Sequence, residues 1–257
     1  MDFWEFGVFI LGCLVGSFVN VLIDRIPAGE SVMRGRSHCD HCRRTIAWYE
    51  LVPVISWIFQ RGKSRCCRKH LSLQYPLIEL INGIGFVCIY FFSFTYHLSL
   101  ITLIFSLSLF SSAVALFMTD VKSELLPTPL LWAAGLSAIA GSFFRAGSAG
   151  QFCLYYVLPA VATALFFHLL RVATSGKAMG DGDVPLAFIL GIVTGYPLVV
   201  VSLYLAFLTG AFFGVILILG RMKTLKSHIP FGPFLIIGGI VALQWGQQLI
   251  HIWKSLL

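Results

Sequence analysis

The sequence VPLAFILGIVTGYPLVVVSLYLAFLTGAFFGVILILG, residues 184–220, decides the fold, because 37 consecutive residues include no Asp, Glu, Lys or Arg. A helix needs about 20 predominantly apolar residues to cross the hydrocarbon core of a bilayer. The run is therefore long enough for two crossings, and Tyr196-Pro197 is predicted to mark the hinge between them.

Similar charge-free runs lie elsewhere in the chain. Residues 80–119 form a run of 40 residues that fits two helices with a turn near residues 93–97. Runs that fit one helix each occupy residues 6–23, 125–144, 146–170 and 227–253. Only 11% of the chain is charged, whereas a soluble domain carries about 25%. The sequence therefore predicts an all-α, polytopic membrane protein with about eight transmembrane helices.

The distribution of lysine and arginine orients these helices. With eight spans, one face receives residues 25–70, 120–124, 171–183 and 221–226, which hold 16 of the 18 basic residues. Only Arg145 and Lys254 fall on the opposite face. Positively charged loops remain in the cytoplasm, so we expect this face of the inner or plasma membrane protein to be cytoplasmic and both termini to lie outside. The net charge of +7 follows from the same rule and indicates a lipid bilayer, not nucleic acid, as the partner.

The chain is predicted to have two parts. Residues 1–75 comprise the first helix and a basic cytoplasmic loop that contains cysteines, and residues 76–257 comprise seven helices with short connections. The loop includes an apolar stretch at residues 48–59. This stretch is expected either to pack against the helices or to lie in the membrane interface.

Acidic residues are rare in the second part, and all of them lie at predicted cytoplasmic helix ends: Asp120, Glu124, Asp181 and Asp183. Ionisable groups near the bilayer are costly and are functional candidates by default. Two carboxylates brought close together would share one proton. The ionised member can then take a proton from water while the protonated member polarises a scissile carbonyl. Gly180 and Gly182 beside these acids would permit a positive φ and the close approach of a substrate strand.

The residues alone leave several alternatives open. Charges often only border membrane helices, and Glu124 and Asp181 compete with the other acids for a catalytic role. Asp181 and Asp183 could instead hold magnesium in a metal-dependent membrane transferase, because magnesium prefers carboxylate oxygen ligands. A proton-coupled transporter with Asp120 or Asp183 as its relay is a further alternative, but it leaves the large cysteine-bearing loop unexplained.

Four of the seven cysteines lie in the cytoplasmic loop: Cys39, Cys42, Cys66 and Cys67. A reducing cytoplasm disfavours disulfides, and Cys-x-x-Cys spacing suits a tetrahedral zinc ion. We therefore predict that these four residues bind zinc. His70 is an alternative to Cys66, because adjacent cysteines chelate less comfortably. The other three are expected to be packing residues within helices: Cys13, Cys88 and Cys153.

Several motifs follow one another along nearly the whole chain. The first helix and the loop contain Gly16-Ser17-Phe18-Val19-Asn20-Val21, Trp48-Tyr49-Glu50-Leu51-Val52-Pro53 and Tyr75-Pro76-Leu77-Ile78-Glu79. The later segments contain Asp120 with Leu126-Pro127, then Met179-Gly180-Asp181-Gly182-Asp183, then Ile229-Pro230-Phe231-Gly232-Pro233-Phe234. In this order and spacing the motifs resemble those of the bacterial type IV prepilin peptidases, the leader peptidase/N-methyltransferases of the GxGD aspartic peptidase class.

The resemblance implies a function and a catalytic pair. It implies that Asp120 and Asp183 are the catalytic carboxylates, with Asp183 as the terminal residue of the GxGD motif. The implied substrates are prepilin or pseudopilin proteins, whose basic leader is removed at the cytoplasmic membrane face. S-adenosylmethionine is implied as the methyl donor for N-methylation of the new N-terminus.

Two features depart from the pattern of that family. Ser64 occupies the usual position of the third loop cysteine, and Cys66 stands beside Cys67 instead. Pro185 replaces the usual lysine two residues after Asp183. The first departure puts the normal zinc geometry in question, and neither removes a catalytic carboxylate.

Overall fold

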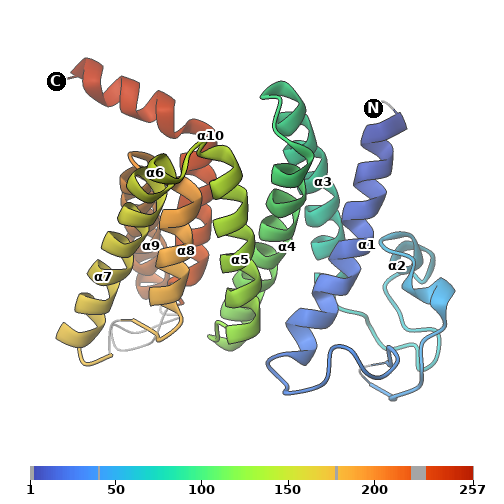
Figure 1. The fold of residues 1–257 in the computed structure, drawn as a ribbon. Helices are drawn as coiled ribbons and strands as arrows, with labels where there is room; N and C mark the ends of the chain where they lie inside the picture. The colour runs from blue at the N-terminus through green and yellow to red at the C-terminus, as the bar shows by residue number, and fades with distance from the viewer. Residues whose placement is uncertain (1–2, 40, 177–178, 221–229, 257) are drawn as a thin grey trace. The chain divides into compact units, whose positions relative to one another are not determined.

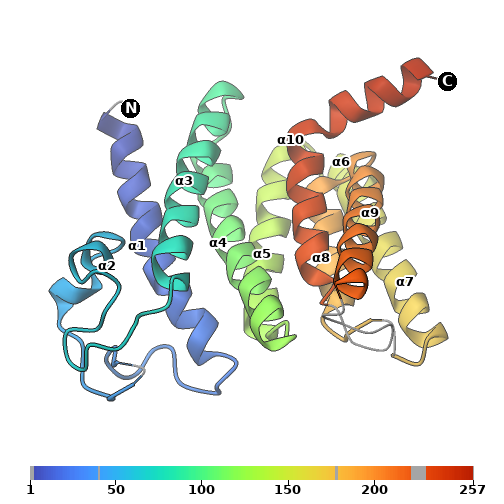
Figure 2. The same cartoon turned by 180° about the vertical axis from the view of Figure 1, so that it is seen from behind.

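The computed structural model describes residues 3–39, 41–176, 179–220 and 230–256. These residues form helices joined by turns, and no β-strand is found among them (Figure 1; Figure 2). The chain divides into two compact units, Met1–Ala115 and Leu116–Leu257. Each of the eight predicted apolar segments corresponds to a helix, which confirms the all-α polytopic architecture. The functional division predicted at residue 75 stays a prediction.

The first unit contains four helical elements followed by the first part of a fifth: α1 (Phe3–Arg25), a 3-10 turn (Trp48–Leu51), α2 (Ile55–Phe59), α3 (Gln74–Thr95) and α4 (Leu100–Ser123). The second unit begins within α4 and continues with α5 (Thr128–Arg145), α6 (Ala149–Phe152), a π-helical turn (Cys153–Val157), α7 (Leu158–Ala173), α8 (Asp183–Thr194), α9 (Leu198–Leu219) and α10 (Gly232–Leu256). The turn predicted near residues 93–97 separates α3 from α4, and the hinge predicted at Tyr196-Pro197 separates α8 from α9.

The apolar helices differ in length. Six described segments are long and apolar enough to cross a bilayer: Phe3–Arg25, Gln74–Thr95, Leu100–Ser123, Ala149–Ala173, Leu198–Leu217 and Gly232–Ser255. The other two, α5 and α8, have 18 and 12 residues. At a rise of 1.5 Å per residue, α8 extends for about 18 Å, which is shorter than a hydrocarbon core of roughly 30 Å.

Glycines bring α1 and α3 into close contact in the first unit. A Cβ atom at Gly12 would lie 2.7 Å from the carbonyl oxygen of Asn82, and one at Gly16 would lie 2.7 Å from the Cα of Glu79. Glycines four residues apart allow two membrane helices to approach at backbone distance. This contact fixes the start of α3 against the second half of α1.

We expect Gly16→Leu to destabilise the first unit, because a leucine side chain would force α1 and α3 apart. Overpacking of this kind costs about 1–3 kcal/mol, and it would appear as a lower Tm of the detergent-solubilised protein. Gly7→Leu is the matched control, because a Cβ at Gly7 in the same helix meets nothing within 4 Å. An equal loss of Tm in both variants would contradict the assignment of this contact.

The apolar stretch of the loop is only partly packed. Trp57 of α2 is half-buried, and Gly62 packs against its ring. Trp48 and Phe59, by contrast, expose 78% and 79% of their surface. Of the two expectations for this stretch, exposure of these rings favours the membrane interface, where amphipathic aromatic residues are common.

Helix α8 is the centre of the second unit. It packs against α5, α7, α9 and α10 and buries Leu186, Ala187 and Ile192. In both views the starts of α5, α8 and α10 lie at the same end of this unit as the ends of α4, α7 and α9 (Figure 1; Figure 2). This arrangement gathers Asp120, Glu124 and Asp181 at one end, as the sequence predicted for the acidic helix ends.

Polar groups from other segments satisfy the backbone where α8 stops short. The Ser142 hydroxyl donates to the carbonyl of Ile192 at 2.8 Å, and Arg145 Nη2 donates to the carbonyl of Val193 at 3.4 Å. The N–H of Tyr196 donates to the carbonyl of Tyr155, in the π-helical turn, at 2.8 Å. Non-helical backbone is tolerated at membrane depth only where its polar groups find such partners.

Arg145 is therefore expected to stabilise the second unit through the end of α8. Arg145→Met keeps the length of the side chain but removes its donors to Val193 and Ser142, and we expect a loss of about 1–2 kcal/mol of stability. Lys254→Met is the control, because Lys254 is the other basic residue predicted on that side and is exposed. Thermal unfolding in detergent measures both, and similar Tm values for the two variants would argue against this role.

Candidate active site and cysteine cluster

Asp120 lies in the last turn of α4, with only 5% of its surface exposed. Its Oδ2 atom is buried and makes no hydrogen bond to any residue that the structure describes. Because buried polar atoms normally have a partner, this oxygen is suited to receive a hydrogen bond from a substrate group or water. Glu124 is exposed instead, and its backbone N–H donates to the carbonyl of Asp120 at 2.9 Å.

Asp183 is the first residue of α8 and is also 5% exposed. Its Oδ2 accepts a hydrogen bond from the backbone N–H of Gly180 at 2.9 Å, so the turn before α8 orients the carboxylate. The carboxyl groups of Asp183 and Asp120 interact electrostatically. Two of the four predicted acids, from helices far apart in the sequence, are thus brought together in a buried position.

Asp181 has a different environment from Asp183. Its side chain is 84% exposed and forms an ion pair with Nη2 of Arg171 at the end of α7. The two aspartates of the Gly-Asp-Gly-Asp segment therefore have separate partners, which disfavours a magnesium ion held between them. This difference in burial also separates two residues that the sequence pattern alone left equivalent.

Of the two glycines of this segment, Gly182 is required for packing. A Cβ at Gly182 would lie 2.5 Å from the Cβ of Leu126, in the segment that follows α4. Neither Gly180 nor Gly182 has a positive φ, so the expected left-handed conformation is not found. The physical reason is that Gly182 continues into the first turn of α8 with φ −77° and ψ −18°, a right-handed conformation open to any residue.

Gly232 is a site residue that the sequence analysis did not single out. A Cβ at Gly232 would lie 2.5 Å from Oδ2 of Asp120, and the backbone amide of Gly232 interacts with the same carboxyl group. Gly232 begins α10, and a helix N-terminus favours a negative charge. The ring of Phe231, the residue before Gly232, packs against the rings of Phe207 and Phe167. The distances between ring centroids are 5.1 Å and 6.1 Å, and these contacts fix the start of α10. In the sequence, the Phe231-Gly232-Pro233 motif was the feature that could have identified Gly232 as a site residue.

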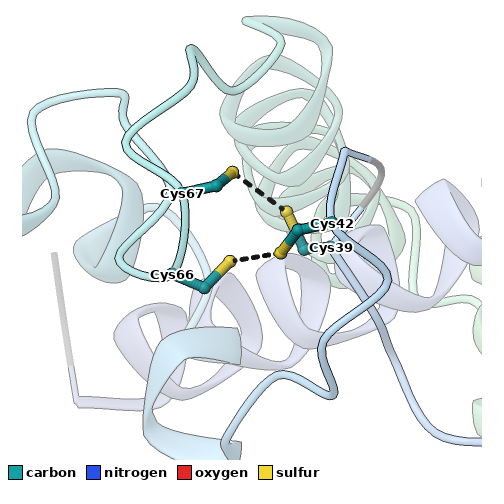
Figure 3. A group of neighbouring side chains, drawn as sticks. All are labelled: Cys39, Cys42, Cys66 and Cys67. Atoms are coloured by element: carbon teal, nitrogen blue, oxygen red, sulfur yellow. Dashed lines mark hydrogen bonds between the residues drawn. The ribbon is translucent and has the colours of Figure 1, made fainter.

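In the first unit, the four loop cysteines form one cluster (Figure 3). All four Sγ atoms lie within 4.8 Å of one another, with 3.8 Å between Cys39 and Cys67 and 3.1 Å between Cys42 and Cys66. His70, the alternative ligand, is not part of this group of described residues. Its backbone carbonyl meets a ring nitrogen of His41 at 3.4 Å.

The two halves of the cluster have the same backbone structure. His38 pairs with Thr45 in one half, and Lys63 pairs with His70 in the other. The N–H of Cys39 donates to the carbonyl of Arg44, and the N–H of Ser64 donates to the carbonyl of Lys69. Both turns then contain an arginine with φ 59°, at positions 43 and 68. Ser64 is therefore the structural counterpart of Cys39, and Cys67 is the counterpart of Cys42.

Cys66 compensates for Ser64 in this arrangement. The Oγ of Ser64 lies 3.4 Å from Sγ of Cys39 and 2.9 Å from Sγ of Cys66. Cys66 lies two residues after Ser64 in the turn. Its thiol thus fills the place that the thiol of a cysteine at residue 64 would occupy. Adjacent cysteines can share the cluster because their side chains project from different points of the turn.

The donor set fits a tetrahedral metal ion. Zn–S bonds of about 2.3 Å in a tetrahedron place sulfur atoms about 3.8 Å apart, close to the spacing found here. Burial disfavours the Cys39 thiolate, but hydrogen bonds from Ser64 and from the backbone of Cys42 and His41 outweigh it and lower the pKa of Cys39 to about 6. The hydrogen bond shared with Cys66 raises the pKa of Cys42 to about 11.

The helical fold defines a polytopic membrane protein, and comparison with known protein families defines its class as a peptidase. Residues 10–93 match the family model of the bacterial peptidase A24 N-terminal domain, and residues 107–215 match that of the type IV leader peptidase family. The chain belongs to the type IV leader peptidase family.

Relatives match along almost the whole chain. A prepilin leader peptidase/N-methyltransferase of Aeromonas hydrophila is 34% identical over 272 residues, which cover 94% of this chain and 91% of that protein. The proteins of the same name from Stutzerimonas stutzeri and Bacillus subtilis (strain 168) are 32% and 30% identical. These matches cover 93% and 96% of this chain, and 90% and 96% of the relatives. No solved structure matches the chain.

Proposed function

We propose that the chain is an endopeptidase that removes the basic leader of type IV prepilins or pseudopilins at the cytoplasmic face of the membrane. The observation that carries this proposal is the pair of buried, interacting carboxyl groups of Asp120 and Asp183. The names of the relatives support the substrate class. The basic residues that the sequence assigns to the same predicted face as the acids support the cytoplasmic orientation.

The two carboxyl groups share one proton, because adjacent buried carboxylates cannot both ionise easily. The ionised carboxylate accepts a proton from water as the water oxygen bonds to the scissile carbonyl carbon. The protonated carboxyl donates a hydrogen bond to the carbonyl oxygen, and a proton then passes to the nitrogen as the C–N bond breaks. The products are the carboxylate of the leader and the amine of the mature N-terminus.

The residues around the pair have positioning roles in this reaction. Gly180 holds the carboxylate of Asp183 through its N–H. Gly232 lies against Asp120, and any side chain there would displace the carboxyl group. The absence of a described partner on Oδ2 of Asp120 supports its contact with the attacking water or the scissile group. Gly180, which is exposed, also leaves the backbone open to a substrate strand.

The same protein is proposed to methylate the amine that cleavage releases. S-adenosylmethionine, when bound, would supply the methyl group that this amine receives. We assign this activity to the part of the chain formed by residues 1–75, where the cysteine cluster is proposed to hold a structural zinc ion through Cys39, Cys42, Cys66 and Cys67.

The decisive experiment is co-expression of the full chain with a prepilin, followed by mass spectrometry of the pilin N-terminus. We expect a single cut between the basic leader and the hydrophobic segment, together with an added methyl group. Uncleaved prepilin in cells that contain the folded protein would refute the peptidase. Cleaved but unmethylated pilin would refute only the methyltransferase.

A further inference from the structure

A cavity of about 630 Å³ lies within the first unit, between the second half of α1, the first turns of α3 and the loop that joins them. This volume is in the range of about 300–1,000 Å³ that is typical of small-molecule sites. All of its lining residues belong to the first unit, and the aspartates proposed for the peptidase reaction are not among them.

Buried polar groups of α1 and α3 form one side of the cavity. Asn20 and Glu79, which both line it, are 3% and 7% exposed. Oε2 of Glu79 accepts a hydrogen bond from the N–H of Val54 at 2.7 Å, and the Ser17 hydroxyl also donates to this carboxylate. Both of these donors are neutral. A buried carboxylate is costly unless a positive charge faces it, so the site favours a cationic ligand.

Aromatic rings form the opposite side, which the loop contributes. Trp57 and Tyr49 both line the cavity. The Nε1 atom of Trp57 is buried and has no hydrogen-bond partner among the described residues. Its N–H is therefore free to donate to a bound ligand. Aromatic faces bind cations and also stack on nucleic acid bases.

Two of the arginines that line the cavity, Arg25 and Arg65, are engaged with the loop itself. Arg25 donates to three carbonyl oxygens, those of Ser31, Arg34 and Arg36, at 3.1–3.3 Å. Arg65 lies 3.9 Å from Glu50 and 5.5 Å from the ring centroid of Tyr49. These positive charges hold the loop over the cavity, and the carboxylate of Glu79 remains to attract a positive ligand.

We propose that this cavity is the binding site for S-adenosylmethionine, an inference that rests on the proposed methyltransferase function. The ligand carries a positive sulfonium and an ammonium group, which match Glu79. Its adenine matches the ring faces of Trp57 and Tyr49 and offers acceptor nitrogens to the Trp57 N–H. The cavity thus combines a buried carboxylate, aromatic rings and an indole N–H that has no partner among the described residues.

Direct binding tests the proposal without reference to activity. The full-length protein in nanodiscs is titrated with radiolabelled S-adenosylmethionine, and the Kd is measured by equilibrium dialysis. We expect Glu79→Gln to weaken binding at least about tenfold, because it removes the charge but keeps an oxygen for the Val54 N–H. Trp57→Phe keeps an aromatic ring and loses only the N–H donor, so we expect about fivefold weaker binding.

Two control variants and one competitor make the test specific. Glu5→Gln and Trp48→Phe change the same residue types outside the cavity lining and should leave the Kd at the wild-type value. Wild-type Kd values for both Glu79→Gln and Trp57→Phe would overturn the site. Displacement of the radioligand by S-adenosylhomocysteine is expected, whereas displacement by a basic leader peptide alone would make the cavity a substrate site and also overturn it.

Failure of this site is distinguishable from failure of the proposed function. Leader cleavage by the wild-type protein is measured on a prepilin in the same preparation and does not involve the methyl donor. A wild-type protein that cleaves prepilin but binds no S-adenosylmethionine would refute the cavity assignment and leave the peptidase intact. Should the glutamine variant fold poorly, the conservative Trp57→Phe variant still decides the outcome.

Discussion

Replacing either Asp120 or Asp183 with asparagine is expected to abolish leader removal, with a rate loss of about 1,000-fold or more. Asparagine keeps the size of the side chain, so the buried position is retained. It can neither accept the proton of the attacking water nor share a proton with the remaining aspartate. The ratio of mature pilin to prepilin after co-expression measures the effect, and the Tm of each purified variant shows whether it has folded.

Asp181→Asn is the matched control for this prediction, since it makes the same chemical change two residues away. Asp181 is exposed and paired with Arg171, and exposed ion pairs contribute only about 0–1 kcal/mol. We expect this variant to keep most of its cleavage activity. A protein in which Asp181 is essential and Asp183 is dispensable would contradict the assigned site, as would substantial cleavage by Asp120→Asn.

Asp181 and Asp183 illustrate where sequence reasoning stops. Composition and spacing identified the acidic segment, but the choice between its two aspartates came only from the family resemblance. The reason is that burial depends on where α8 begins. The helix starts at Asp183, whose carboxyl group is buried and accepts from the N–H of Gly180, while Asp181 lies in the preceding turn and pairs with Arg171. A pattern of alternating Gly and Asp holds no information about that starting point.

The helices were predictable because the bilayer offers no partners for exposed charges or backbone groups. Charge-free runs therefore located all eight segments, and the Tyr196-Pro197 hinge was placed correctly. The partners at the end of α8 were not predictable. Arg145 was interpreted only as one of two basic residues on the far side, whereas its donor groups reach a carbonyl 48 residues away. Such contacts depend on how helices pack, which a single sequence does not specify.

Gly232 shows that the contacts of a site residue, too, could not be predicted from the sequence. Its segment was recognised as a motif, but a glycine before a proline at a helix start has several explanations. The contact with Asp120 arises because α10 begins beside the end of α4, more than 100 residues earlier in the chain.

The cysteine loop differs, because both halves of that cluster lie within a short stretch of sequence. The grouping of its four cysteines was predicted correctly, although the place of Cys66 beside Ser64 was not.

The equivalence of Ser64 and Cys39 leads to a rescue experiment on the proposed zinc site. Cys66→Ala removes one of four thiolates, and we expect zinc affinity to fall on the order of 100-fold. Adding Ser64→Cys to that variant should restore most of the affinity. The new thiol would stand at the counterpart of Cys39, where the present Oγ lies 3.4 Å from Sγ of that residue. The double variant would then have the usual two Cys-x-x-Cys pairs.

The wild-type protein, the single variant, the double variant and a control variant are compared in parallel. Zinc content is measured by mass spectrometry of the purified protein, and zinc affinity by competition with a chromogenic chelator. Cys88→Ala is the control, because Cys88 is an exposed thiol of α3 outside the cluster. Recovery in the double variant would mean that the backbone of the second half already has the geometry of the first, so that only the sulfur has moved. If Cys66→Ala retains wild-type zinc affinity, Cys66 is not a ligand. If the double variant stays as weak as the single one, Ser64 is not the counterpart of Cys39, because a thiol at that position would then fail to reach the ion that the other three share.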